Sequence, residues 1–571
     1  MHVLIPCFLP SSPSSSSSTS LLFSPPPSFF RYTHFVGQIE DAQDNVTGAT
    51  QDCVPWYNHG HQPADPAWGS AYTFLAELIF EQYDDDDVVG LRYTGIKAHL
   101  DSLTKQAGID NDGGLLDFSW WGDWCPPSGC RAEGKNHDNS ALVSSFEYIS
   151  QLRMMARFAG ILGKPADAAK YAALDKAVSA EFVKRFYVPE NKTFFEPNRP
   201  AGDEELTVQT CISLASSLGL VPAADSAAVF DTLVHDVVVK NNGHLDVGIV
   251  GVKELLPALV AGGRPDVALQ VAQTPDAPGW VYMVLQGATT LWETWTGTRY
   301  DPVASWNHIM FGSQSAWYFE SLAGIQLAEG SRGWQRLLLA PKVWAGAASP
   351  PASICGNLSY VSASVDTIRG KAAAAWECAP TFTAGTCQAD IQEHAVAHLA
   401  CGAESTISSV TFASYGNSTG TCASGFRASS CDAKSSVALL TKLCVGKSSC
   451  AVTVDSTTFG GDPCFGTKKH LDVVIQCSKA PKPTGPGPLQ FTYTVTVPTG
   501  SSASVVLPTF GAKAADAALA IQEGGVNVWA GGKFVAGVAG VVGATAGADA
   551  AGPHIAIEVG DGDYVFTVFA E

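Results

Sequence analysis

The chain has 571 residues, of which 46% are hydrophobic, and a formal net charge of -20. This length suits roughly three or four domains of about 150 residues each, and the apolar content excludes wholesale disorder. The acidic balance repels phosphate backbones and so disfavours nucleic acid as a partner, whereas a neutral ligand such as a sugar is compatible with it. No apolar run reaches the 18 or so residues that a membrane-crossing helix needs, so no membrane span is expected.

Residues 1–34 are predicted to be low-complexity and disordered. The stretch up to Phe30 is rich in Ser and Pro, and its short apolar patch is broken by Pro6 and has no basic residues before it. This is a poor signal peptide, so the tract indicates either disordered sequence or a mistaken gene start.

The apolar pattern is helical from about residue 70 to 330, within a predicted domain of residues 35–330. Apolar side chains recur every three or four residues between 142 and 162 and again between 171 and 186, and Gly163 and Pro165 separate the two segments. The same pattern predicts further helices at 206–215, 227–238 and 252–261. Helices joined by short loops indicate helical hairpins packed side by side.

A β pattern follows residue 330. Residues 336–340 and 360–376 look extended, residues 491–497 alternate strictly between apolar and polar, and residues 554–569 carry two more strand-like runs. The sequence predicts a β-sandwich split into residues 331–380 and 489–571, with an insertion at 381–478. Residues 479–488, rich in Pro and Gly, are predicted to be a stiff, unstructured linker.

Ten of the 15 cysteines fall between Cys355 and Cys477, and none of these ten lies in a Cys-x-x-Cys pair. This distribution favours a disulfide framework over zinc. Together with four Asn-x-Ser/Thr sequons, it favours an extracellular or secretory location despite the poor signal peptide. No metal or cofactor is expected.

Ten of the 14 tryptophans lie between Trp56 and Trp317. Aromatic faces stack on sugar rings, so a tryptophan-rich cleft is typical of a glycosidase, although each Trp could instead be a large core residue. Glu293 lies between Trp292 and Trp295 in an otherwise uncharged segment, where a buried carboxylate is costly unless it is used or well hydrogen-bonded.

Six stretches of this region, in order and spread over residues 36–330, resemble the α-L-rhamnosidases of glycoside hydrolase family 78. They are Asp65–Gly69, Gly122–Trp124, Gly243–Gly248, Pro278–Met283, Gly287–Trp295 and Ser305–Gly312. The resemblance implies an (α/α)6 barrel that hydrolyses terminal α-L-rhamnose with inversion. Inverting enzymes use a carboxylic acid and a carboxylate about 6.5–9.5 Å apart.

The resemblance also implies roles for single residues. Glu293 matches the general base, and His308 matches a histidine that contacts the sugar, although a satisfied structural histidine is an equal alternative. The other candidate substrate-binding residues are Asp123, Trp124, Trp68, Trp292 and Trp295.

One departure concerns the general acid, which in the family lies in an upstream Arg-Asp-Glu motif that this chain lacks. The first barrel helices are not recognisable either, so the barrel is expected to be incomplete, through a truncated gene model or a degenerate copy. Asp65 and Asp123 are weaker candidates for the acid, and Ser70 replaces a family Asp. A non-catalytic carbohydrate-binding pseudoenzyme is the alternative function. The acidic run at 84–87 is predicted to be a solvated loop rather than a calcium site.

Between residues 393 and 477, Phe412–Gly416, Cys444–Cys450 and Gly461–Leu471 resemble the galactose/rhamnose-binding lectin domain known from sea-urchin eggs and plant β-galactosidases. The resemblance implies that Glu393, Tyr415, Asp462 and Lys469 bind sugar. A carboxylate accepts hydrogen bonds from vicinal hydroxyls, an ammonium donates, and an aromatic face packs on the ring. A simple surface ion pair between Asp462 and Lys469 is the alternative.

The same resemblance implies four disulfides, Cys387–Cys422, Cys401–Cys477, Cys431–Cys464 and Cys444–Cys450. Asn417 replaces a frequent Arg, which leaves the preference for galactose or rhamnose open. The expected fold is multidomain: an incomplete all-α (α/α)6 barrel plus an all-β sandwich, with an inserted disulfide-rich α/β lectin domain. The expected partners are rhamnose- or galactose-containing glycans.

Overall fold

The computed structural model describes the greater part of the chain. The described residues are 27–55, 60–108, 114–127, 140–195, 207–297, 304–342, 358, 360–378, 387–393, 395–401, 405–422, 425–447, 449–479, 489–510, 512–516, 519–550 and 552–569. The predicted linker at 479–488 therefore lies outside them, apart from Lys479, which ends one strand.

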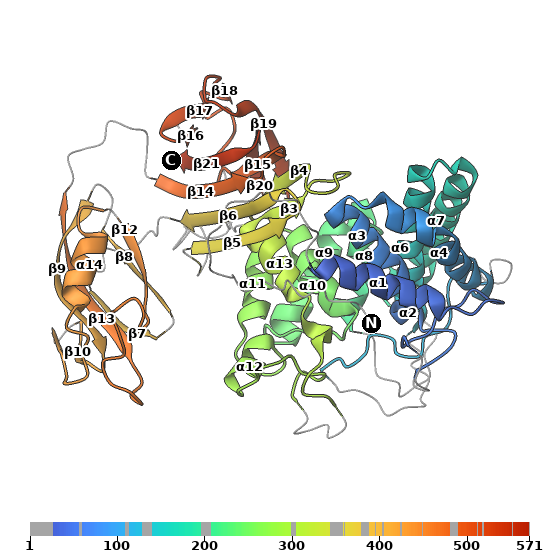
Figure 1. Ribbon diagram of the computed structural model, residues 1–571, viewed down its shortest axis with the longest axis horizontal. Helices are drawn as coiled ribbons and strands as arrows, with labels where there is room; N and C mark the ends of the chain where they lie inside the picture. Colours follow the sequence, from blue (N-terminus) through green and yellow to red (C-terminus); the bar gives the residue numbers. More distant parts are fainter. Residues whose placement is uncertain are drawn as a thin grey trace.

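The first part of the chain is helical, as predicted (Figure 1). Its helices are α1 (Pro27–Asp41), α2 (Pro66–Gly69), α3 (Ala71–Tyr83), α4 (Asp86–Gln106), α6 (Ser140–Ile161), α7 (Pro165–Phe186), α8 (Val208–Ser217), α9 (Ser226–His235), α10 (Gly251–Ala261), α11 (Pro265–Gln273), α12 (Trp280–Leu285) and α13 (Gln314–Trp317). Two short strands, β1 (Tyr187–Val188) and β2 (Thr193–Phe194), pair in a hairpin after α7. The five helices predicted from periodicity are confirmed to within a few residues.

Helix α1 corrects the predicted disorder of residues 1–34, because it begins at Pro27. Proline suits the first turn of a helix, where its missing N–H would have had no intrahelical partner. Val36 and Ile39 are buried in the core of the helical region, and Phe35 packs against that core. The Ser/Pro composition concealed this apolar face. Residues 1–26 lie outside the described residues.

The second part is a two-sheet β-sandwich. One sheet has the order β18-β17-β16-β21-β14-β6-β5 and the other β19-β20-β15-β4-β3. The strands are β3 (Ile325–Leu327), β4 (Arg336–Leu339), β5 (Tyr360–Thr367), β6 (Gly370–Cys378), β14 (Leu489–Val497), β15 (Ser502–Pro508), β16 (Ala520–Glu523), β17 (Val526–Ala530), β18 (Lys533–Phe534), β19 (Val541–Asp549), β20 (Gly552–Val559) and β21 (Gly562–Phe569).

Both sheets join segments from either side of the inserted module. In one sheet β6 pairs with β14, and in the other β4 runs parallel to β15. The sandwich begins at Ile325, a few residues before the expected position 331. Buried aromatic side chains fill its core, and their polar ends are satisfied by backbone carbonyls: Trp376 donates to Leu322 and Tyr493 to Ala323.

The inserted module lies beyond the sandwich at the left of Figure 1. It contains β7 (Cys387–Gln392), β8 (Val396–Ala400), β9 (Ser405–Gly416), β10 (Thr419–Thr421), β11 (Gly425–Arg427), α14 (Ser436–Cys444), β12 (Ser449–Thr453) and β13 (His470–Lys479). Strand β13 pairs with both β7 and β9. Helix α14 packs on β9, and the module has a hydrophobic core of its own.

The acidic run at 84–87 connects the helical region to the sandwich and is not simply solvated. The guanidinium of Arg332, in the turn between β3 and β4, forms ion pairs with Asp84 (2.8 Å) and Asp86. The same guanidinium lies 5.3 Å from the ring centroid of Phe80 on α3. Asp85 caps α4 by accepting the amide of Asp87. These carboxylates therefore hold the sandwich against α3 and α4.

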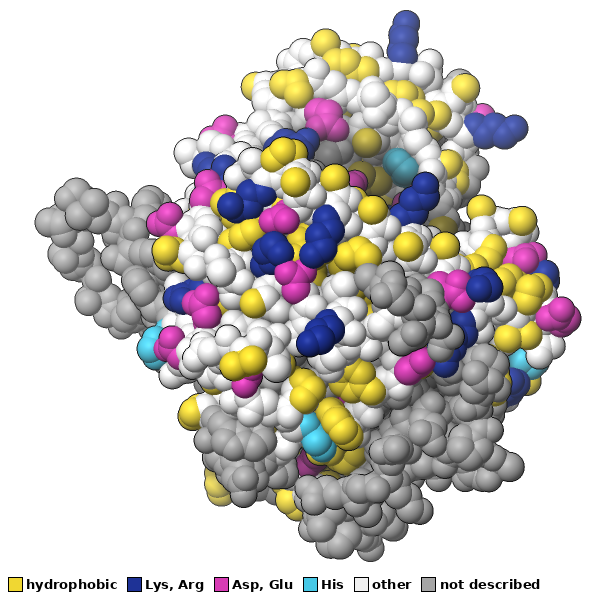
Figure 2. Space-filling view, turned by 90° about the vertical axis from the view of Figure 1, so that its right-hand side faces the viewer, with side chains coloured by type: hydrophobic (Ala, Val, Ile, Leu, Met, Phe, Trp, Pro, Cys, Tyr) yellow, Lys and Arg dark blue, Asp and Glu magenta, His cyan; other side chains and the backbone are white. Residues whose placement is uncertain are grey.

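Figure 2 shows the face of the molecule formed largely by the helices, where acidic and basic side chains are interspersed with apolar ones. The overall negative charge is therefore not gathered into one patch on this face. Among the described residues, no helix is long and apolar enough to cross a bilayer.

Candidate functional site

Glu293 is half-buried and is held by two neutral donors from distant parts of the chain. Its Oε2 accepts the backbone amide of Ser305 at 2.7 Å, and its Oε1 lies 3.4 Å from the indole Nε1 of Trp124. In return, the Glu293 amide donates to the Ser305 carbonyl at 2.9 Å. These contacts fix the orientation of the carboxylate without placing a cationic side chain against it.

The two tryptophans that flank Glu293 in sequence are core residues. Trp295 is buried between Phe311, with ring centroids 3.9 Å apart, and Trp280, and its indole donates to the Val247 carbonyl. Trp292 is also buried, and its ring meets that of Trp306 edge to face. The structure therefore places Trp292 and Trp295 in the core of the helical region rather than on an open surface.

His308 lies close enough to Glu293 for the charge of that carboxylate to affect the pKa of the His308 ring. Burial lowers the pKa of His308, and the negative Glu293 carboxylate opposes this shift. The Met310 amide donates to Nδ1 of His308 at 3.3 Å, which caps a short 3-10 helix, η3 (Ile309–Phe311). With Nδ1 acting as an acceptor, the proton of the neutral ring is assigned to Nε2.

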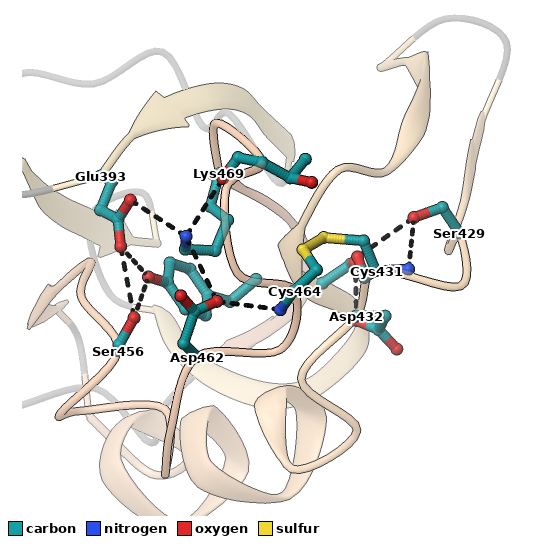
Figure 3. The surroundings of a disulfide bond; sticks show 11 residues. Glu393, Ser429, Cys431, Asp432, Ser456, Asp462, Cys464 and Lys469 are labelled. Atoms are coloured by element: carbon teal, nitrogen blue, oxygen red, sulfur yellow. Dashed lines mark hydrogen bonds and ion pairs between the residues drawn. A yellow bond between two sulfur atoms is a disulfide. The ribbon is translucent and has the colours of Figure 1, made fainter.

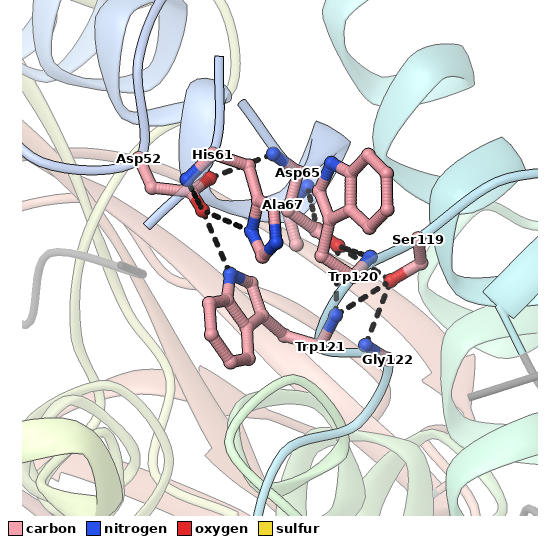
Figure 4. Close-up of polar contacts among 8 residues, drawn as sticks. All are labelled: Asp52, His61, Asp65, Ala67, Ser119, Trp120, Trp121 and Gly122. Atoms are coloured by element: carbon pink, nitrogen blue, oxygen red, sulfur yellow. Dashed lines mark hydrogen bonds and ion pairs between the residues drawn. The ribbon is translucent and has the colours of Figure 1, made fainter. Parts of the chain in front are cut away.

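Trp124 contacts a network of aromatic and acidic side chains, of which Figure 4 shows Asp52, His61, Trp120 and Trp121. Trp124 meets Trp121 edge to face at 5.2 Å, and the Trp121 indole donates to Asp52 at 2.9 Å. Asp52 also accepts from the His61 ring at 3.1 Å, and that ring stacks on Trp120 at 4.3 Å. Trp68, a predicted substrate-binding residue, packs on Trp121, with the ring centroids 5.9 Å apart.

Asp65 and Asp123 have carboxylates that are fully engaged by the protein. Asp65 is completely buried and accepts from the side chain of Ser119 and from three backbone amides. Burial raises its pKa, and these hydrogen bonds oppose that rise.

Asp123 accepts from the hydroxyl of Thr210 at 2.5 Å and from the amides of Gly248, Val250 and Gly251, at the start of α10. Neither carboxylate is presented to a ligand in this geometry.

Asp246 is an acidic residue that the sequence reasoning passed over. Burial, together with the nearby charges of Asp236 and Asp123, raises its pKa to about 6. It precedes Val247, whose carbonyl accepts from the indole of Trp295. Its signal in the sequence was a lone acid in the stretch Gly243–Gly248.

The predicted sugar-binding residues of the lectin-like module form one polar cluster (Figure 3). The ammonium of Lys469 lies 3.3 Å from Asp462 and 3.6 Å from Glu393. The ammonium also donates to the Thr467 carbonyl at 3.1 Å. Ser456, which the sequence reasoning missed, bridges Glu393 and Tyr415 through its hydroxyl.

Tyr415 is placed beneath this cluster rather than at its surface. Its ring is fully buried and stacks on Phe459 with centroids 4.8 Å apart, while its hydroxyl donates to Glu393. Burial, followed by the hydrogen bond to Glu393, raises the pKa of Tyr415 to about 12. Tyr415 therefore orients Glu393 and offers no free ring face to a sugar.

Four disulfides staple the module. They are Cys387–Cys422, Cys401–Cys477, Cys431–Cys464 and Cys444–Cys450, which are the pairs that the resemblance implies. The Cys431–Cys464 bridge lies directly beside Asp462, whose carboxylate accepts the Cys464 amide at 2.9 Å. Among the described residues, no group of three or more His, Cys, Asp or Glu side chains could hold a metal ion.

Known proteins are similar to this chain in two places, the helical region and the inserted module. The family profile of the bacterial alpha-L-rhamnosidase 6 hairpin glycosidase domain matches residues 29–322, and that of the D-galactoside/L-rhamnose binding SUEL lectin domain matches residues 399–477. An alpha-L-rhamnosidase of Streptomyces avermitilis is 28% identical over 317 residues, which is 54% of this chain and 28% of the relative. Beta-galactosidase 7 of Oryza sativa subsp. japonica is 47% identical over 77 residues, 14% of this chain and 10% of the relative.

Solved structures show the same fold at low identity. The alpha-L-rhamnosidase from Dictyoglumus thermophilum superposes with a TM-score of 0.62 at 22% identity, covering 95% of this chain and 44% of that one. The Streptomyces avermitilis alpha-L-rhamnosidase complexed with L-rhamnose gives 0.57 at 20% identity, covering 94% and 36%. The chain spans between 28% and 34% of the length of the curated alpha-L-rhamnosidases that it matches. Because the glycosidase profile covers just over half of it, the chain belongs to the bacterial α-L-rhamnosidase family of six-hairpin glycosidases and carries an inserted SUEL-type lectin domain.

Proposed function

We propose that this chain hydrolyses terminal α-L-rhamnosides at Glu293, with inversion of configuration, and binds glycans through its lectin domain. The observation that carries the proposal is the setting of Glu293, a half-buried carboxylate oriented by Trp124 and Ser305. It is further supported by the rhamnosidases named among the relatives.

In the proposed reaction, Glu293 removes a proton from the water that attacks the anomeric carbon. Two neutral donors fix the direction of this carboxylate, and a general base must be held within hydrogen-bonding reach of the proton that it removes. An indole N–H and a backbone amide satisfy part of its hydrogen-bonding capacity, and the remaining lone pairs are available to a water.

His308 would orient the sugar. Because burial lowers its pKa, the ring is neutral near neutral pH, and its Nε2–H can donate to a sugar hydroxyl. Asp123 and Asp65 are assigned positioning roles, because their oxygens are taken by protein donors. Asp123 ties the start of α10 to the segment that carries Trp124.

The engaged state of Asp65 and Asp123 favours a second candidate function, that of a carbohydrate-binding protein without turnover. Neither residue can donate a proton to a leaving oxygen in this geometry. A glycosidase lacking a general acid depends on a leaving group that departs as a stable anion, so it should cleave activated aryl glycosides but not alkyl glycosides.

The test measures release of p-nitrophenol from p-nitrophenyl α-L-rhamnoside by the full chain, beside methyl α-L-rhamnoside as an unactivated substrate. Loss of turnover in Glu293→Gln, by roughly two to four orders of magnitude, is expected for a general base. Glu329→Gln, which changes an exposed carboxylate between β3 and β4, is the matched control. Equal turnover by Glu293→Gln and the unaltered chain would contradict the assignment of the base.

Cleavage of the aryl substrate alone would mean that the chain acts without a general acid. Turnover of neither substrate favours the non-catalytic binder. The anomer first released, read by proton NMR, distinguishes inversion from retention.

For the lectin domain we propose that Glu393, Asp462 and Lys469 bind a terminal galactose or rhamnose. The disulfides also support a proposed extracellular or secretory location, because such bridges persist in oxidising compartments. Calorimetric titration with D-galactose and L-rhamnose tests the binding role. An Asp462→Ala chain that binds both sugars as tightly as the unaltered chain would refute it.

A further inference from the structure

Phe465 stands out at the edge of the lectin cluster. Its side chain is 99% exposed, and no other large apolar side chain among the described residues is more exposed. Single exposed apolar residues are common on protein surfaces, so exposure by itself assigns no role. The position of Phe465 in the loop supplies the reason to assign one.

Phe465 occupies a tight turn that presents its side chain outward. The Thr467 amide donates to the Cys464 carbonyl at 3.2 Å, so Phe465 and Gly466 are the two central residues of this turn. Gly466 has φ of +78°, which suits the third position of a type II turn. This turn makes no demand for an aromatic residue before its glycine, so the fold does not explain Phe465.

Two constraints hold the residue before Phe465, which donates to the carboxylate of Asp462. The preceding residue, Cys464, donates its amide to Asp462 at 2.9 Å and is bound to Cys431 by a disulfide. A turn held in this way keeps an aromatic ring at the rim of the polar cluster, where it loses little conformational freedom when a ligand arrives.

The cluster also needs an aromatic face that Tyr415 does not provide. Sugar recognition combines polar groups for the hydroxyls with an aromatic face for the apolar side of a ring. Glu393, Asp462 and Lys469 supply the polar groups, whereas the ring of Tyr415 is fully buried against Phe459.

We propose that Phe465 determines specificity for glycans of at least two sugars. The terminal galactose or rhamnose would occupy the cluster of Glu393, Asp462 and Lys469, and the next sugar would stack on the ring of Phe465. This assignment rests on the proposed sugar-binding function of that cluster. The preferred ligand is therefore a neutral oligosaccharide with a galactose or rhamnose end, bound more tightly than the monosaccharide.

The test titrates the full chain, carrying Glu293→Gln so that rhamnosides are not consumed, with four sugars. D-galactose is paired with lactose, and L-rhamnose with rutinose, because each disaccharide carries that monosaccharide at its non-reducing end. Phe465→Ala is expected to weaken disaccharide binding roughly three- to tenfold and to change monosaccharide binding by less than about twofold. Phe465→Leu, which keeps apolar bulk without a ring face, should weaken disaccharide binding as well, and Phe465→Trp should preserve it.

Val542→Ala is the matched control, because Val542 is a 74% exposed apolar residue on β19 of the sandwich. Disaccharide binding that is unchanged in both Phe465→Ala and Phe465→Leu overturns the inference and leaves the lectin function intact. Equal weakening for monosaccharide and disaccharide also overturns it, because Phe465 would then contact the first sugar. Failure of the unaltered chain to bind any of the four sugars would overturn the proposed lectin function together with the inference.

Discussion

Glu293 in the helical region is held by an indole N–H and a backbone amide, whereas Glu393 and Asp462 in the lectin domain lie on either side of the Lys469 ammonium. In the first arrangement, none of the contacts seen within the described part of the chain brings a Lys or Arg side chain against the carboxylate. The second places one ammonium against two carboxylates, and the pKa of Asp462 is lowered, chiefly by the hydrogen bond from the Cys464 amide and then by Lys469.

This difference agrees with the proposed roles of the two sites, which are proton transfer at Glu293 and sugar binding in the lectin domain. A general base must accept a proton from water, and a neighbouring ammonium would make protonation of the carboxylate less favourable. A lectin carboxylate has only to accept hydrogen bonds, and an ion pair keeps it ionised and oriented for that purpose. The two regions also differ in what holds them: long helices around a large core in one, and four disulfides around a small core in the other.

The largest expected effect is a loss of stability confined to the disulfide-linked lectin domain. Cys401→Ser with Cys477→Ser opens a bridge that spans 76 residues, which should destabilise the lectin domain by about 4 kcal/mol. Differential scanning calorimetry should show its transition lost or lowered while turnover of the aryl rhamnoside persists. Loss of both together would mean that the two regions do not fold independently.

Removing the Asp123 carboxylate should break the helical region instead. Asp123→Ala leaves the amides of Gly248, Val250 and Gly251 without their acceptor, at a cost of about 3 kcal/mol. Urea unfolding followed by tryptophan fluorescence measures this loss, and sugar binding by the lectin domain should be unaffected. The control is Asp117→Asn, an exposed partner of Arg185, which should change stability by less than about 1 kcal/mol.

Acid should also weaken the helical region through His99. This ring is fully buried between Thr50 and Gln151, and burial lowers its pKa from 6.5 to about 4. The unfolded chain therefore takes up a proton at higher pH than the native chain, so native stability is lost as the pH falls from about 6.5 towards 4.

Compared with His99→Gln, the unaltered chain should lose roughly 2 kcal/mol more stability between about pH 7 and pH 5. Taking the difference between the two chains cancels other titrating groups, such as Glu77, whose pKa is raised to about 7, mainly by burial. Denaturant midpoints at the two pH values measure the effect. As the control, His235→Gln changes a histidine at the exposed end of α9, and this variant should lose as much stability between the two pH values as the unaltered chain does.

The smallest expected effect concerns the Lys469 ammonium, which distinguishes the lectin site from the surroundings of Glu293. Lys469→Met removes the ammonium between Glu393 and Asp462 and should weaken binding of galactose or rhamnose by about tenfold. The neighbouring exposed lysine gives a matched control, Lys468→Met, for which titration should detect little change. Equal losses in the two variants would point to general attraction rather than to the cluster.

Much of the fold was predictable because its signals are local. The apolar period of α6 and α7 and the alternation in β14 need only a few turns or residues of sequence to be recognised. The start of α1 was missed because a Ser/Pro tract dilutes its apolar face. The contact of Asp84 and Asp86 with Arg332 joins positions about 250 residues apart, which composition alone does not reveal.

The site was less predictable, because sequence gives the residue type but not the direction in which a side chain points. Glu293, Trp124 and His308 were named from the sequence, yet it did not distinguish these from Trp292 and Trp295, which face the core. The role of Ser305 was hidden because it acts through its backbone amide. For Asp65 and Asp123, the donors come from loops whose geometry only the folded chain defines.

The pairing of β6 with β14 and of β4 with β15 sets an order of events during synthesis. The ribosome must synthesise the whole lectin segment before either partner strand exists, so β4 and β6 each emerge with one hydrogen-bonding edge unpaired until β15 and β14 follow. The lectin segment can meanwhile form its core and its four bridges, because all of its paired cysteines lie within residues 387–477. The sandwich is thus completed last, by the strands from residue 489 on, and until those strands are synthesised the open edges of β4 and β6 are exposed to aggregation.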